Sequence, residues 1–168
     1  MCSKTDGTFW TWGRGGGGEG GRNGTSNENS PTQLPGTNWP TADFKLMPGF
    51  YSAGAIKTDG TLWTWGANGS EGPLGHNNTQ DYSSPRQVGS GTDWDKTGAM
   101  GRLFAHATKT DGTLYIWGSN SYGQLAQNTQ GGNIKSPVQV PGTTWRQGTA
   151  ADNWAVYTKT DNTLWAWG

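Results

Sequence analysis

Short apolar runs, each introduced by the polar sequence Lys-Thr-Asp-Gly or Lys-Thr-Asp-Asn, recur four times along the chain. Each run ends in Trp-Gly, and the four copies occupy residues 4–13, 57–66, 109–118 and 159–168. A turn-forming Asp-Gly between two apolar runs predicts a β-hairpin, because the tight turn needs positive φ. Asp161-Asn162 serves in the last copy, since Asn enters the left-handed region more easily than most residues. We expect incoming strands over 50–57, 103–109 and 154–159, and outgoing strands over 61–65, 113–117 and 163–167.

A second motif, which begins with Ser-Pro and ends in Trp, lies between these copies and keeps their period. It covers residues 30–39, 84–94 and 136–145. Two independent motifs with one period of about 50 residues indicate an internal repeat. We therefore predict a single repeat domain over 1–168, with approximate repeats at 14–66, 67–118 and 119–168 after a partial repeat at 1–13.

The direction of the side chains predicts how the hairpins pack. Neighbouring side chains alternate along a strand, so Trp63 and Trp65 share one face and Leu62 points to the other. Both faces are apolar, which places each hairpin between two neighbours. Two shorter strands per repeat bring the total to about four strands, the size of a propeller blade. We predict an all-β fold of about three full four-stranded blades plus an extra hairpin, with no helix.

Three blades are too few to close a ring, because propellers usually hold four to eight. Open rings leave apolar faces and strand edges that favour association. We therefore expect an incomplete or assembled ring, in which further repeats, further copies or another protein cover the open faces.

Composition excludes several functional classes. The chain has 29 Gly and 11 Trp, and its 12 basic and 12 acidic residues leave no net charge. A neutral chain without basic runs lacks the electrostatic signature of a nucleic-acid-binding protein. No apolar stretch is long enough for a membrane helix. The single cysteine, Cys2, cannot form an internal disulfide.

No pattern predicts a catalytic, cofactor or metal site. The repeated aspartates are explained by their turns and lack neighbouring oxygen ligands. His76 and His106 belong to different structural positions and have no third ligand nearby in the sequence, whereas zinc needs three or four. The glycine-rich segment 15–21 lacks both the following helix and the Lys-Ser/Thr pair of a phosphate-binding loop.

The aromatic residues divide into a repeating and a non-repeating group. Recurrence at the blade period predicts a core role for Trp12, Trp65, Trp117 and Trp167 and a structural role for Trp39, Trp94 and Trp145. The non-repeating aromatics are better candidates for binding. They are Phe44, Tyr82 and Tyr122.

The segment 117–125, Trp-Gly-Ser-Asn-Ser-Tyr-Gly-Gln-Leu, resembles the hallmark of the regulator-of-chromosome-condensation repeat. Residues 65–75 match it with one extra residue and Pro73 in place of Gln, whereas the first copy has drifted to glycine. Residues 52–60 also resemble the strand and turn that precede this hallmark in the family. The resemblance covers essentially the whole chain and implies a β-propeller. The simple, nearly identical repeats look most like prokaryotic or phage versions.

Fold alone does not define function, and family members differ widely in what they do. We favour a non-catalytic protein-interaction or structural module with other proteins, or further copies and repeats, as partners. A virion or extracellular surface is favoured over the cytoplasm. A carbohydrate-binding module with glycan ligands is the alternative. A GTPase-regulating protein that resembles a nucleotide-exchange factor is the second alternative.

Overall fold

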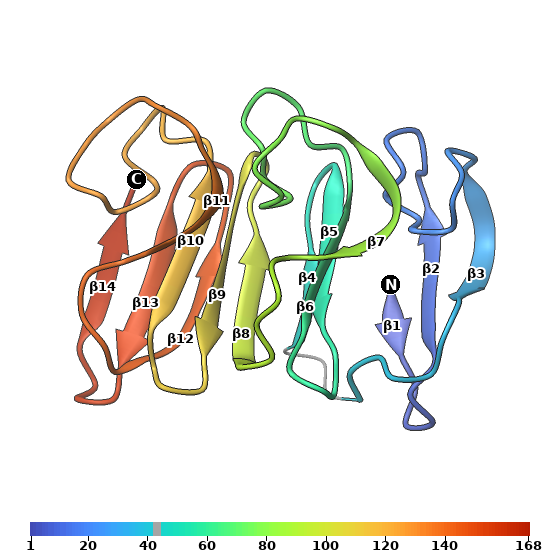
Figure 1. Ribbon diagram of the computed structural model, residues 1–168, viewed down its shortest axis with the longest axis horizontal. Helices are drawn as coiled ribbons and strands as arrows, with labels where there is room; N and C mark the ends of the chain where they lie inside the picture. The colour runs from blue at the N-terminus through green and yellow to red at the C-terminus, as the bar shows by residue number, and fades with distance from the viewer. Residues whose placement is uncertain (42–44) are drawn as a thin grey trace.

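A computed structural model describes residues 1–41 and 45–168, which form four antiparallel β-sheets standing side by side in a row (Figure 1). The described residues contain no α-helix and no helix that could cross a membrane. The all-β prediction is confirmed. The strands are β1 (Cys2–Ser3), β2 (Phe9–Gly13), β3 (Glu28–Leu34), β4 (Leu46–Pro48), β5 (Ser52–Ile56), β6 (Leu62–Gly66), β7 (Tyr82–Gln87), β8 (Trp94–Met100), β9 (Phe104–Lys109), β10 (Leu114–Gly118), β11 (Ile134–Gln139), β12 (Trp145–Ala150), β13 (Ala155–Lys159) and β14 (Leu164–Trp167).

Strands that follow one another in the chain are neighbours in each sheet. The first sheet has the order β1-β2-β3, the second β4-β5-β6-β7, the third β8-β9-β10-β11 and the fourth β12-β13-β14. The inner strand β8 lies against both β4 and β12, the inner strands of the two neighbouring sheets. The predicted repeat boundaries at 66/67 and 118/119 follow directly on β6 and β10, so both four-stranded sheets combine strands of two sequence repeats. In place of the predicted three blades and a hairpin, the strands form four sheets. The second and third sheets have the four strands of a full blade, and the first and fourth sheets have three strands each.

The three Lys-Thr-Asp-Gly segments and the final Lys-Thr-Asp-Asn form the turns that join β1 to β2, β5 to β6, β9 to β10 and β13 to β14. The amide of Gly60 donates to the carbonyl of Lys57 over 3.0 Å, and Gly60 has φ of 79°. Gly7 (78°), Gly112 (79°) and Asn162 (65°) repeat this conformation. Only the last of the three loop residues has positive φ, so the turn is a three-residue loop and not the tighter two-residue Asp-Gly turn.

The aspartate of each turn is held by the threonine that follows it. Asp59 Oδ1 accepts hydrogen bonds from the amide of Thr61 (3.0 Å) and from its hydroxyl (2.6 Å). The other three turns repeat both bonds. The hydroxyl bond is the main reason that the pKa of Asp59 lies below its ordinary value. This geometry supports the predicted turn role of the repeated aspartates.

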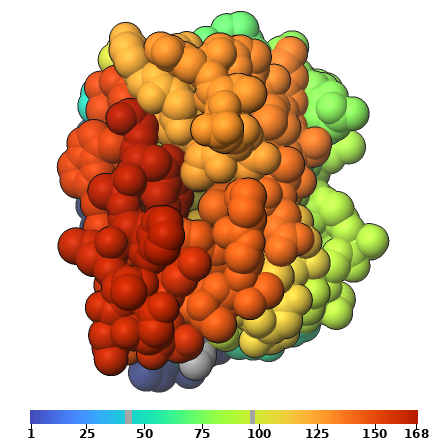
Figure 2. Space-filling model, turned by 90° about the vertical axis from the view of Figure 1, so that its left-hand side faces the viewer, coloured from blue at the N-terminus to red at the C-terminus, as the bar shows by residue number. Residues whose placement is uncertain are grey.

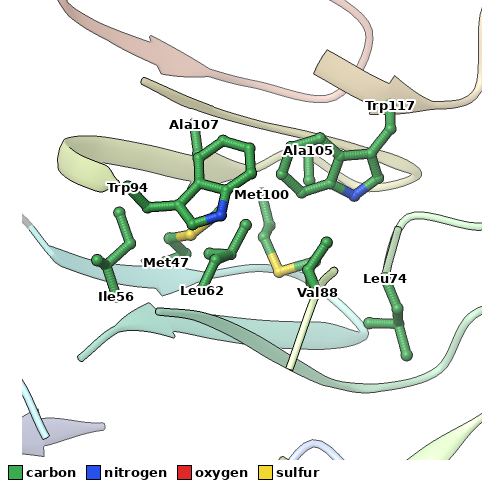
Figure 3. Packing of buried hydrophobic residues seen from close by; sticks show 10 residues of the cluster. All are labelled: Met47, Ile56, Leu62, Leu74, Val88, Trp94, Met100, Ala105, Ala107 and Trp117. Carbon is green, nitrogen blue, oxygen red and sulfur yellow. The ribbon is translucent and has the colours of Figure 1, made fainter. Parts of the chain in front are cut away.

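Successive side chains of β6 point to opposite faces of the second sheet, and each face packs into a different hydrophobic core. Leu62 and Ile56 pack between the second and third sheets, together with Trp94 and Trp117 (Figure 3). Trp65 lies on the opposite face and packs against the first sheet. Each fully buried large side chain contributes roughly 1.5–3 kcal/mol to stability, which explains why every sheet is fixed to its neighbours.

The repeated tryptophans connect each sheet to a loop of the preceding one. Trp65 and Trp117 are fully buried, and their indole N–H groups donate to the carbonyls of Glu19 (2.9 Å) and Pro73 (2.7 Å). Trp167 makes the same bond to Gln124 and is partly buried. Trp12 was predicted to lie in the core, but it is 46% exposed because the described residues place no sheet against its face. The buried positions of Trp39, Trp94 and Trp145 agree with their predicted structural role.

The row of sheets does not close into a ring, as expected, and its two end sheets lie far apart (Figure 1). The fourth sheet turns an outer face to solvent (Figure 2), on which Leu164 is 69% exposed. Leu62 and Leu114, at the same position of the second and third sheets, are fully buried.

Candidate functional site

Three short hairpin loops with one shared geometry stand at the rim opposite the Lys-Thr-Asp turns (Figure 1). Each joins an inner strand to the next strand of its sheet: β4 to β5, β8 to β9 and β12 to β13. An amide at the start of each loop donates to a carbonyl three residues later. The pairs are Gly49 with Ser52 (3.0 Å), Gly101 with Phe104 (2.8 Å) and Ala151 with Trp154 (3.0 Å).

The residue at the second position of these loops differs in chemical character from sheet to sheet. It is Phe50 in the second sheet, Arg102 in the third and Asp152 in the fourth. All three side chains are exposed, and Phe50 exposes 67% of its surface. A repeated backbone that carries an aromatic, a cation and an anion in turn is a rigid support for surface recognition.

The three loops surround one hollow of about 580 Å³. Contact between the inner strands β4, β8 and β12 brings the loops together, although about 50 residues separate each from the next. Backbone and small or apolar residues form most of the wall, and Met100 and Pro48 contribute to it. Loops on a rigid scaffold are a common place for binding sites.

Aromatic side chains extend this surface beyond the hollow. Phe50 packs edge-on against Tyr51, with 4.6 Å between the ring centroids. The guanidinium of Arg14, from the first sheet's long loop, lies 5.1 Å from the centre of the Tyr51 ring. In the fourth sheet, Trp154 is 48% exposed. Aromatic and arginine side chains of this kind are enriched where proteins bind one another.

The wall of the hollow holds few ionisable side chains among the described residues. Its residues include one cation and one carboxylate, Arg102 and Asp152, and no Ser, Cys or His. Across residues 1–41 and 45–168, no three metal-ligating side chains cluster together. Burial lowers the pKa of His106 to about 3, and burial with Arg86 nearby lowers that of His76 to about 4. Both imidazoles are therefore neutral at pH 7, and they lie away from the hollow.

Tyr82, a predicted binding residue, begins β7 and is already occupied by contacts within the protein. Its hydroxyl accepts hydrogen bonds from Arg86 (2.7 Å) and from the side chain of Asn78 (3.0 Å). His76 packs edge-on against its ring at 5.1 Å. The side chain is only partly exposed.

Tyr122 offers a freer surface, since it is 61% exposed. It lines a second hollow of about 570 Å³ with Gln130 and Trp167. Phe44, the third predicted residue, lies outside the described residues. Among the described residues, Tyr82 does not line the hollow that contains Tyr122.

Sequence reasoning missed Phe50, Arg102 and Asp152 because it searched for unusual aromatic residues rather than for variable positions within the repeat. A signal was present nonetheless. The segments Pro-Gly-Phe-Tyr, Met-Gly-Arg-Leu and Ala-Ala-Asp-Asn occupy one position of the repeat and precede strands of closely similar sequence.

A protein-family model, the regulator of chromosome condensation (RCC1) repeat, matches residues 59–96 and 111–151. Among curated proteins, an RCC2 homologue from Danio rerio is 37% identical over 86 residues, which cover 51% of this chain and 17% of the relative. The human E3 ubiquitin-protein ligase HERC2 is 32% identical over 131 residues, which cover 77% of this chain and 3% of the ligase. The chain thus spans only a small part of these relatives.

Solved structures share the fold at low sequence identity. Prp20p from Saccharomyces cerevisiae superposes with a TM-score of 0.79 at 20% identity, over 99% of this chain and 41% of Prp20p. Human WBSCR16 gives 0.76 at 20% identity, over 99% of this chain and 44% of that protein. Both comparisons place the four sheets among the β-propellers.

Proposed function

Because the chain belongs to the RCC1 repeat family, we propose that it is a non-catalytic protein-binding module that contacts its partner through the rim of three hairpin loops. The observation that carries this proposal is the variation of one exposed position, occupied by Phe50, Arg102 and Asp152, on a backbone that otherwise repeats. A position required only for folding would keep one residue type, as the buried Trp positions do.

The chemical content of the rim suits a protein surface better than a small substrate. The hollow is open, carries opposite charges on neighbouring loops and has an exposed aromatic ring beside it. A partner can insert an apolar side chain against Phe50 and pair its own charges with Arg102 and Asp152. Such an arrangement supplies both an anchor and charge-based selectivity.

The relatives suggest which partners to examine first. Prp20p was characterised for its binding to Gsp1p and histones, and yeast RCC1 (Prp20) was crystallised bound to Kap60. For this chain, Gsp1p, Kap60 and histones are therefore the first candidate partners to test. The prediction of a virion or extracellular location remains a separate proposal.

The test is a binding measurement with rim and control variants. Purified chain is immobilised, and binding of Gsp1p, Kap60 and histones is followed by biolayer interferometry. The rim variant carries Phe50→Ser, Arg102→Gln and Asp152→Asn, and the control variant carries Asn133→Ser, at an exposed position outside the three loops. We expect the rim variant to weaken binding at least about tenfold, equivalent to 1.4 kcal/mol, and the control to leave it unchanged.

Two results would count against the proposal. One is the absence of binding to all three proteins, and the other is binding that the rim variant leaves intact. Release of a fluorescent GDP from Gsp1p, measured with and without the chain, separates simple binding from regulation of a GTPase. Faster release that depends on the rim would favour the regulatory alternative.

A further inference from the structure

Two grooves of matching composition run between the outer strands of neighbouring sheets. The first, of about 470 Å³, has residues of β3 and β7 in its walls, and the second, of about 500 Å³, has residues of β7 and β11. Their walls place the same residue types at equivalent positions of the repeat. The shared pairs are Asn23 and Asn77, Gln33 and Gln87, Ser84 and Ser136, and Lys57 and Lys109.

An asparagine in left-handed conformation is held rigidly in each groove. Asn23 and Asn77 both have φ of 57°. Their backbone amides donate to carbonyls of the next sheet, that of Ser83 (2.7 Å) and that of Lys135 (2.8 Å). These bonds fix the backbone and leave the side-chain amides exposed. An amide that is exposed on a rigid backbone is well suited to bind a polar ligand with little loss of entropy.

A lysine lies between aromatic rings in each groove. The ammonium of Lys57 is 4.5 Å from the centre of the Trp39 ring and 4.0 Å from that of Trp63. Lys109 is 5.3 Å from Trp94 and 5.0 Å from Tyr115. Cation–π contacts hold these charges in place at the groove wall.

The groove walls are basic although the whole chain is neutral. The first groove holds Arg22 and Lys57, the second holds Arg86 and Lys109, and neither wall includes a carboxylate. Glu28 pairs with Arg22 (2.7 Å) and Asp93 with Lys109 (3.0 Å), both from outside the walls. Among residues 1–41 and 45–168, no salt bridge engages Lys57 or Arg86, so each groove keeps one cation outside any salt bridge, with the Asp59 carboxylate acting on Lys57 from the adjacent turn.

The second groove also contains a buried donor without a protein acceptor. In the first groove the indole N–H of Trp39 donates to the carbonyl of Pro35 over 3.0 Å. The corresponding N–H of Trp94 has no such partner, although the side chain is only 6% exposed. Gly91 lines the groove beside it, and a Cβ atom placed on Gly91 would lie 3.6 Å from this nitrogen. Because this nitrogen is covered in the described structure, a ligand oxygen would reach it only after a shift of the groove wall.

We propose that the two grooves bind an acidic polysaccharide, with one uronate-bearing unit in each groove. The amides and hydroxyls match the hydroxyl groups of a sugar, the free cation matches its carboxylate, and the partly buried rings of Trp63 and Tyr115 offer apolar edges. Two equivalent grooves on successive sheets suit a polymer of repeating units. A peptide, in contrast, presents different side chains to each site. This proposal concerns a different surface from the hairpin-loop rim.

The experiment uses polygalacturonate as the probe, with dextran as a neutral polymer and poly-L-glutamate as an acidic peptide. Binding is measured by isothermal titration calorimetry at low salt. The first-groove variant is Asn23→Gly with Gln33→Ala, and the second-groove variant is Asn77→Gly with Arg86→Gln. Glycine preserves the left-handed backbone at both asparagines. Arg102→Gln, at the rim, is the charge-matched control for Arg86→Gln.

We expect polygalacturonate to bind and dextran not to bind. Each groove variant should weaken binding at least about tenfold, because loss of one of two linked sites removes avidity. Arg102→Gln should leave the affinity unchanged. If Asn77→Gly unfolds the chain, Arg86→Gln alone serves as the second-groove variant, because among the described residues the exposed Arg86 side chain donates a hydrogen bond to Tyr82 alone.

Three results would overturn the proposal. The first is no binding of polygalacturonate, and the second is equal binding by both groove variants and the unmodified chain. The third is equal affinity for poly-L-glutamate, which would identify the grooves as sites for acidic peptides. Since the rim variant and the groove variants alter separate surfaces, failure here leaves the protein-binding proposal standing, and the reverse also holds.

Discussion

The hydroxyl of Tyr157 on β13 and Nδ1 of His106 on β9 share a buried hydrogen bond across the interface between the third and fourth sheets. Their rings also meet edge-on, with centroids 4.9 Å apart. Both side chains are fully buried. The positions that correspond to His106 in the neighbouring sheets hold Gly54 and Val156, so this polar pair occurs at one interface only among the described sheets.

Removal of the Tyr157 hydroxyl is expected to destabilise the chain. In Tyr157→Phe, Nδ1 of His106 stays buried without its partner, which costs about 1–3 kcal/mol. Tyr115→Phe is the matched control, because that ring is partly exposed and packs edge-on against Trp94. Urea denaturation measures the free energy of unfolding. Equal losses in the two variants would show that the buried bond adds nothing.

The same pair predicts a dependence of stability on pH. Burial lowers the pKa of His106 to about 3, so the unfolded chain, with an ordinary histidine pKa of 6.5, binds more protons between these values. The contribution of the neutral, buried His106 to the free energy of unfolding is therefore fully present above about pH 6.5. It decreases as the pH falls toward 3. His76, with its pKa lowered to about 4, acts in the same direction.

A double variant isolates the contribution of the buried pair to this acid sensitivity. His106→Leu with Tyr157→Phe replaces both partners by apolar groups, which is expected to change stability little at pH 7. Its free energy of unfolding should decline less between pH 6.5 and pH 4 than that of the unmodified chain. An unchanged pH profile, measured by urea denaturation at each pH, would show that His106 does not titrate as the structure implies.

The turn glycines differ in the space around them, which predicts unequal effects of substitution. A Cβ atom on Gly60 would lie 2.0 Å from the carbonyl oxygen of Thr92, whereas one on Gly112 would lie 3.2 Å from the nearest atom, the amide nitrogen of Thr144. Both residues have φ of 79°, which costs a β-branched residue about 1–3 kcal/mol in strain. We expect Gly60→Val to destabilise more than Gly112→Val.

Asn162→Gly is the control for these two variants, because glycine adopts the same φ of 65° without strain. Thermal melts followed by circular dichroism should place the midpoints in the order Asn162→Gly, Gly112→Val and Gly60→Val, from highest to lowest. Valine without effect at Gly60 and Gly112 would be incompatible with the hairpin turns described above.

Tryptophan fluorescence is expected to separate into a protected and an accessible fraction. Trp65 and Trp117 are fully buried and should be poorly quenched by iodide, whereas Trp12 and Trp154 expose 46% and 48% of their surface. In Trp12→Phe the quenchable fraction should decrease. A quenching curve that this substitution leaves unaltered would mean that a neighbouring surface covers Trp12 in solution.

The alternation and the turns were predictable because they depend on residues within ten positions of one another. Lys-Thr-Asp-Gly specifies a turn through its own backbone hydrogen bonds, and the Asp59–Thr61 contacts lie within the same segment. The expected strands over 103–109 and 113–117 differ from β9 and β10 by one residue at three of the four ends. The local pattern did not predict the length of the loop. A two-residue turn and a three-residue loop differ by a single residue, and both accept Gly at the position with positive φ.

The binding surfaces were less predictable, because each depends on chain segments that only packing brings together. Phe50, Arg102 and Asp152 surround one hollow since the inner strands of three sheets lie side by side. The hydroxyl of Tyr82, which is predicted to bind a partner, already accepts hydrogen bonds from Arg86 and Asn78. Nothing in the residue type distinguishes a tyrosine that is free from one whose hydroxyl is already bonded.

Local residue pattern specifies the repeat, the strands and the face toward which each side chain points, whereas burial of those faces depends on how the sheets pack together. Trp12, Trp65 and Trp117 occupy the same place in the same motif. Two of them are fully buried and the first is 46% exposed. Backbone geometry sets the direction of a side chain within its own strand, but burial requires a second sheet against that face, and the presence of that sheet is a property of the whole assembly of strands.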